Sequence, residues 1–99
     1  MKDDAVSVAP KIHKILFEND EVRVLDVVVK PHEKAQLHSH PKNVVYALSS
    51  GMLRFTQTNG TIKDVEIAKG GVSYSDGGYH IVENIGNTTV KALQVELKK

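Results

Sequence analysis

The segment that decides the fold is MLRFTQTNGTIKDVEI, residues 52–67, in which two runs of alternating apolar and polar residues flank Asn59-Gly60. An Asn-Gly dipeptide between two such runs is the strongest short-range signal for a β-hairpin, because both residues tolerate the positive φ angles of a tight turn. We therefore expect antiparallel strands at residues 52–57 and 61–67.

Similar strand signals lie on both sides of this hairpin. Strands are predicted at residues 22–29, 44–48 and 89–97. In the last of these, Leu93, Val95 and Leu97 alternate with Gln94 and Glu96, which is the pattern of a half-buried strand with a wet outer face. We expect the three apolar side chains to face the core and the two polar ones to face water.

The composition favours strands throughout the chain. Val, Ile and Thr supply 25 of the 99 residues, whereas Ala, Leu and Met supply 15. β-Branched side chains favour strands over helices, and no window of eleven or more residues carries the apolar stripe of a helix. Because a chain of this length has room for one hydrophobic core, we predict a single all-β domain with loose ends at residues 1–9 and 98–99.

The charge balance and the cysteine content exclude several function classes. The net charge is +1 and only two of the thirteen cationic residues are arginines, so nucleic acid is not an expected partner. Without cysteine, neither disulfides nor thiolate metal sites can form. No run approaches the roughly 18 apolar residues of a membrane span, and residues 1–10 lack the apolar stretch of a signal peptide. We therefore expect no membrane partner and a cytoplasmic protein.

Five histidines are the main candidates for chemistry. His38 and His40 are two residues apart, so in an extended segment both rings point to one face, where two ring nitrogens can converge on a cation. Gln36 shares that face as a candidate oxygen donor. A His-x-His pair is a weak signal by itself, because a single histidine in a strand is more often structural than a ligand.

Two longer patterns contain three of these histidines. His38, His40 and Gly51 fit the pattern G-x5-H-x-H-x(3,4)-E-x6-G, and Gly77, His80 and Asn84 fit the pattern G-x5-P-x-G-x2-H-x3-N. These are the two motifs of the cupin family, which the chain therefore resembles over residues 19–97. The resemblance implies a single-domain cupin jelly-roll β-barrel. In this reading residues 1–18 form an N-terminal segment and the first strand, and residues 19–99 form the cupin domain.

The chain also departs from these motifs. Val44, with Val45 beside it, occupies the position of the motif glutamate, so the usual carboxylate ligand is absent. Three further motif positions, two glycines and a proline, are occupied by His32, Lys69 and Ser75. We expect His32 to adopt the positive φ angle that a glycine would take there, which gives it a structural role. A structural role is also expected for His13, in the N-terminal strand.

The resemblance implies a metal site on His38, His40 and His80. Three neutral imidazoles without a carboxylate favour Fe²⁺, Ni²⁺, Cu²⁺ or Zn²⁺ over Mn²⁺ or Mg²⁺. Val44 and Tyr46 are expected to line the pocket, and Asp76 to approach the metal through a water molecule. Restoring the carboxylate at residue 44 is expected to tighten the binding of Mn²⁺.

Several functions are compatible with such a site. One is a metal-dependent enzyme, for example an oxygenase, that acts on a small organic molecule. Another is a non-catalytic barrel that binds a small ligand or a metal as a sensor or storage module, and a third is a degenerate barrel with an empty site. Small cupins commonly form homodimers, which the resemblance implies here, with residues 15–17 as the expected contact.

Overall fold

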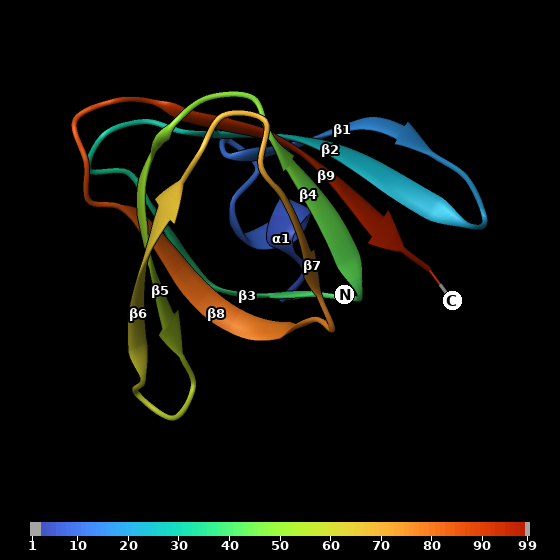
Figure 1. Ribbon diagram of the computed structural model, residues 1–99. Helices are drawn as coiled ribbons and strands as arrows, with labels where there is room; N and C mark the ends of the chain where they lie inside the picture. Colours follow the sequence, from blue (N-terminus) through green and yellow to red (C-terminus); the bar gives the residue numbers. More distant parts are fainter. Residues whose placement is uncertain (1–2, 99) are drawn as a thin grey trace.

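The computed structural model describes residues 3–98, which consist almost wholly of β-strands (Figure 1). In chain order the elements are α1 (Ala5–Val8), β1 (His13–Glu18), β2 (Val22–Val29), β3 (Lys34–His40), β4 (Asn43–Ala47), β5 (Gly51–Gln57), β6 (Ile62–Ile67), β7 (Val72–Ser75), β8 (Gly78–Asn84) and β9 (Val90–Leu97). The predicted all-β class is confirmed.

The strands form two antiparallel sheets that curve around a common interior (Figure 1). One sheet has the strand order β1-β2-β9-β4-β7 and the other has the order β3-β8-β5-β6. Strands adjacent in a sheet are mostly distant in sequence, and the five-stranded sheet joins both ends of the chain to its middle. Within residues 3–98, no helix is long and apolar enough to span a membrane.

The strand predictions hold best where an apolar or alternating run is bounded by turn signals. β2 covers the predicted residues 22–29, and β5 and β6 form the predicted hairpin, with Gly60 at a φ angle of 86° in the turn. β7 and β8 are not predicted, because their sequences, VSYS and GYHIVEN, are short or interrupted by glycine and polar residues. Propensity alone is a weak guide in such segments, where tertiary pairing decides.

The orientation predicted for β9 is wrong. Gln94 and Glu96 are buried inside the barrel, whereas Leu93, Val95 and Leu97 are half-buried on the outer face. The polar side chains are accommodated inside because they find partners there, as when Gln94 Nε2 donates to Asn43 Oδ1 at 3.0 Å. Strand alternation separates two faces but does not say which of them is the interior.

An apolar row consequently crosses the outer face of the larger sheet. Phe17, Val24, Val95 and Val44 are paired in register across β1, β2, β9 and β4. The homodimer expected from the sequence stays a prediction, although side chains at its expected contact are exposed in the single chain, Phe17 by 54%.

The N-terminal segment is docked on the barrel rather than loose. The Asp4 carboxylate caps α1 by accepting a hydrogen bond from Val6 N, and the Asp3 carbonyl accepts one from Ser39 N at 2.7 Å. The expectation of a loose segment is therefore wrong for residues 3–9 and for residue 98, which donates a backbone hydrogen bond to Glu21. Residues 1, 2 and 99 lie outside the described part of the chain.

Glycines of the two motifs have clear structural reasons. A Cβ at Gly77 would lie 2.6 Å from the His40 carbonyl oxygen, and the φ angle of Gly77 is 94°. A Cβ at Gly51 would lie 2.5 Å from the Val90 side chain. The motif asparagine, Asn84, is fully buried and donates to the carbonyls of Val29 and Thr88. These residues shape the barrel around the histidines.

His32 has a φ angle of 69°, as expected from its place at a motif glycine. The left-handed region is strained for a residue with a Cβ. We predict that His32→Gly raises the free energy of unfolding by about 0.5–1 kcal/mol, the strain relieved less the entropy cost of glycine, and that His32→Val lowers it. Urea denaturation measures both, with Lys30→Gly as a control that is expected to be destabilising. A loss of stability in His32→Gly would contradict the assignment of strain.

Candidate metal centre

Four histidines from three strands meet inside the barrel. His13 lies on β1, His38 and His40 on β3, and His80 on β8, where it pairs directly with His38. The ring centroids of neighbouring members lie 4.8 to 5.4 Å apart. The candidate donor atoms of His13, His38 and His40 all lie within 4.8 Å of one another, and these three side chains are buried. The half-buried His80 adds a fourth imidazole beside them.

The structure thus brings together the three histidines that the sequence singles out, and adds a fourth. His13 is only 3% exposed and stands opposite Val27 in the β1–β2 ladder, which turns its ring into the barrel. Sequence reasoning missed it because no motif surrounds it. The one available signal was the pairing of β1 with β2, since the apolar β2 fixes which β1 residues point inward.

One nitrogen of each buried ring is held by the protein. His38 Nδ1 lies 2.7 Å from the Gln36 carbonyl oxygen, His40 Nδ1 lies 2.6 Å from Glu96 Oε2, and His13 Nδ1 lies 3.3 Å from the Ala9 carbonyl oxygen. A carbonyl oxygen or an ionised carboxylate only accepts hydrogen bonds, so Nδ1 carries the proton in each ring. In the neutral imidazole the lone pair is then on Nε2, the atom left free to bind a metal.

His38 Nε2 is the clearest sign of a missing partner. Among residues 3–98, it is the one buried side-chain nitrogen or oxygen without a hydrogen bond. Leaving a buried acceptor unpaired costs on the order of 1–3 kcal/mol. A cation bound by the histidines would satisfy it.

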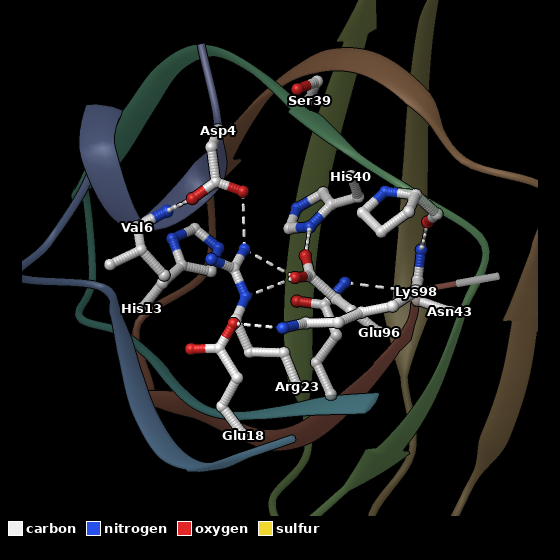
Figure 2. A network of polar contacts seen from close by, with 12 residues as sticks. Asp4, Val6, His13, Glu18, Arg23, Ser39, His40, Asn43, Glu96 and Lys98 are labelled. Atoms are coloured by element: carbon white, nitrogen blue, oxygen red, sulfur yellow. Dashed lines mark hydrogen bonds and ion pairs between the residues drawn. The ribbon is translucent and has the colours of Figure 1, made fainter. Parts of the chain in front are cut away.

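A buried chain of charges supports His40 from behind. Figure 2 shows Arg23 between the carboxylates of Asp4 and Glu96, with His40 on the other side of Glu96. Arg23 Nε donates to Glu96 Oε1 at 2.7 Å, and Arg23 Nη2 lies 2.5 Å from Asp4 Oδ1. Glu96 is only 1% exposed, so its charge is tolerated because Arg23 and His40 occupy its two oxygens. Hydrogen-bonded carboxylates of this kind orient ligating histidines.

Three histidines of the cluster, His13, His38 and His80, are neutral near pH 7. Burial, with the neighbouring imidazoles, lowers the pKa of His13 to about 4 and that of His80 to about 3. Burial also lowers the pKa of His38. A metal ion binds the neutral imidazole, so these rings need release few or no protons when they bind one.

The cluster opens into a cavity of about 580 Å³ between the two sheets. Its wall contains all four clustered histidines and an apolar set that includes Leu53, Phe55, Val82 and Val90. A cavity of this size falls within the range of small-molecule sites.

The other predicted pocket residues do not line this cavity. Val44 and Tyr46 lie on the outer side of β4, whereas Asn43 and Val45 face inward, because side chains alternate along a strand. Asp76 is exposed in the turn before β8. Gln36 is exposed because a bulge between Ala35 and His38 shifts the register of β3. Its contribution is the backbone carbonyl that accepts from His38.

No protein-family model and no curated protein matches the chain. Solved structures do match. The chain is similar to a cupin domain from Bordetella pertussis Tohama I, with a TM-score of 0.81 and 22% identity over 89% of this chain and 93% of that one. It is also similar to a conserved protein with a double-stranded β-helix domain from Klebsiella pneumoniae, with a TM-score of 0.71 and 20% identity over 88% and 76% of the two chains. A predicted oxalate decarboxylase from Thermotoga maritima gives a TM-score of 0.62 and 27% identity over 86% and 77%.

Because Val45 faces the cavity and Val44 does not, the residue at which a carboxylate should tighten metal binding is 45 rather than 44. We predict that Val45→Glu lowers the dissociation constant for Mn²⁺ by roughly tenfold or more, because it adds an anionic oxygen donor beside neutral nitrogens. The matched control, Val44→Glu, places the same carboxylate on the outer face and is expected to leave the constant unchanged. Competition titration measures both. Tighter binding by Val44→Glu alone would show that residue 44 faces the histidines.

The depressed histidine pKa values predict acid sensitivity of the metal-free protein. The unfolded chain protonates His13 and His80 near pH 6.5, while the folded chain keeps them neutral down to about pH 4 and 3. The contribution of these two histidines to the free energy of unfolding is therefore fully present above about pH 6.5. It is lost as the pH falls toward 4, by up to about 1.4 kcal/mol per pH unit for each histidine. Urea denaturation between pH 7 and 5 measures this slope. His13→Leu is expected to reduce this slope by the amount that corresponds to about one proton, whereas His32→Leu, which alters an exposed histidine, is expected to leave it unchanged. Equal slopes in the two variants would contradict the buried, neutral state of His13.

Proposed function

Because the chain has the cupin fold, we propose that it binds a divalent transition metal ion through its histidine cluster and presents that ion to a small organic ligand in the cavity. The observation that carries this proposal is the arrangement of ring nitrogens. His13, His38 and His40 each hold Nδ1 on a protein acceptor, and His38 Nε2 is buried without a partner. His80 is the fourth candidate ligand.

The donor set fits a borderline transition metal. Imidazole nitrogen suits iron, nickel, copper and zinc, whereas magnesium and manganese prefer oxygen donors. Among residues 3–98, the groups of donor atoms close enough to hold an ion contain histidines alone. The outer contacts are also those of a metal site, since Glu96 and two backbone carbonyls fix the ring orientations.

This reading is favoured over a degenerate, empty barrel. An abandoned site would keep an unpaired buried acceptor at His38 with no function to offset its cost. If bound by these histidines, the ion would supply a Lewis acid at the cavity. That is what a metal-dependent enzyme such as an oxygenase needs, and the chain's own residues would hold the ion and enclose the ligand in an apolar wall.

Metal analysis of protein purified without a histidine tag tests the proposal. We expect about one transition metal ion per chain, as one cluster provides one site. His13→Ala, His38→Ala, His40→Ala and His80→Ala are each expected to lower the metal content at limiting metal, whereas His32→Ala, which alters an exposed histidine outside the cluster, retains it. The effect of His13→Ala separates this centre from one built on the two motifs alone.

Two results would overturn the proposal. One is a wild-type protein that binds none of the four metals when they are supplied. The other is equal metal content in the cluster variants and in His32→Ala, which would place the ion elsewhere. Circular dichroism of each variant shows whether a loss of metal reflects a loss of fold.

A further inference from the structure

The wall of the cavity carries charge of only one sign. Among the described residues, 3–98, no aspartate or glutamate lines the cavity, and Lys63 is the one lysine or arginine that does. Asp4 and Glu96 border a separate hollow that also touches His40, and their charges are held by Arg23. Apart from the histidines, the charge of the cavity wall comes from Lys63, an exposed residue of β6.

The pleat of β6 places its lysine toward the cavity and its two acidic residues away from it. Lys63, Val65 and Ile67 line the cavity, whereas Asp64 and Glu66 alternate with them and do not. Asp64 is instead paired with Arg54, its Oδ1 lying 2.8 Å from Arg54 Nε. Among the described residues, the ion pairs leave Lys63 without a carboxylate partner.

An apolar span separates Lys63 from the histidine cluster. Lys63 is paired with Phe55 across the β5–β6 ladder, and the Phe55 ring lies 5.0 Å from the His80 ring. Leu53 and Val82 extend the same apolar surface along the cavity wall. A ligand reaching from the lysine to the histidines would therefore have a charged end, an apolar body lying on Phe55, and a second end at the cluster.

We propose that the cavity binds a small monocarboxylate, with its carboxylate paired to the Lys63 ammonium and its body lying across Phe55 toward the histidines. A single ammonium group matches one carboxylate, and Lys63 is the one lysine or arginine of the wall among the described residues. The inference rests on the proposed function only for the far end of the ligand, which would face the bound metal.

Calorimetric titration with 3-phenylpropionate and its neutral amide tests the inference on zinc-loaded protein of measured metal content. We expect wild type to bind the acid about threefold to fivefold more tightly than the amide, the effect of one ion pair with the exposed Lys63 ammonium. Lys63→Gln is expected to remove most of this preference and to leave amide binding unchanged. The matched control, Lys91→Gln, alters an exposed lysine on β9 that does not line the cavity, and is expected to bind both probes as wild type does.

The outcomes separate this inference from the proposed function. If the chain binds none of the four metals, the metal proposal fails, and the same titrations on metal-free protein still decide the role of Lys63. Equal affinity of wild type for the acid and the amide overturns the inference. So does an acid preference that survives in Lys63→Gln, because the carboxylate would then be bound by the metal centre or by another group. If Lys91→Gln also lost the preference for the acid over the amide, the preference would arise from the overall charge of the protein, and the inference would be overturned.

Discussion

The contact on which the rest of this barrel depends is the one between the buried Glu96 carboxylate and Arg23. An ionised carboxylate at 1% exposure is costly unless its oxygens are paired, and Arg23 and His40 each take one. Arg23 in turn contacts Asp4, which caps α1. The chain of contacts therefore joins β9, β2 and β3 to the N-terminal segment, and the segment that follows α1 carries His13 into the cluster.

This polar interior explains which parts of the structure could be predicted from the sequence. The hairpin at Asn59-Gly60 and the apolar strand at residues 22–29 are local patterns, and both form as expected. The direction in which β9 faces could not be predicted, because its alternation is the same whichever side is buried. Local apolarity pointed to Leu93, Val95 and Leu97 as the core. Glu96 is buried instead, paired with Arg23 on the neighbouring strand and with His40 on the other sheet.

The candidate site, like the fold, could be predicted only in part from the sequence. The spacing of the histidines in the two motifs predicted that His38, His40 and His80 share one site, and they lie together in the structure. His13 was beyond sequence reasoning, because only the β1–β2 register turns it inward. Gln36 was misplaced by a bulge that no sequence pattern signals. The motif spacing, counted back from Gly51, gives residue 44, but the pleat of β4 turns Val45 inward instead. In each case a long-range pairing, rather than a local preference, decided the outcome.

The central claim is that the protein alone prepares Nε2 of His13, His38 and His40 for a metal by fixing the proton on Nδ1. Two-dimensional ¹H–¹⁵N NMR of the imidazole rings in the metal-free protein at neutral pH tests this most directly, because the nitrogen shifts distinguish the two tautomers. The account predicts protonated Nδ1 in all three rings and a bare Nε2 in His38. A proton on Nε2 of His38 or His40 would contradict it, since the atom proposed to bind the metal would then be a donor.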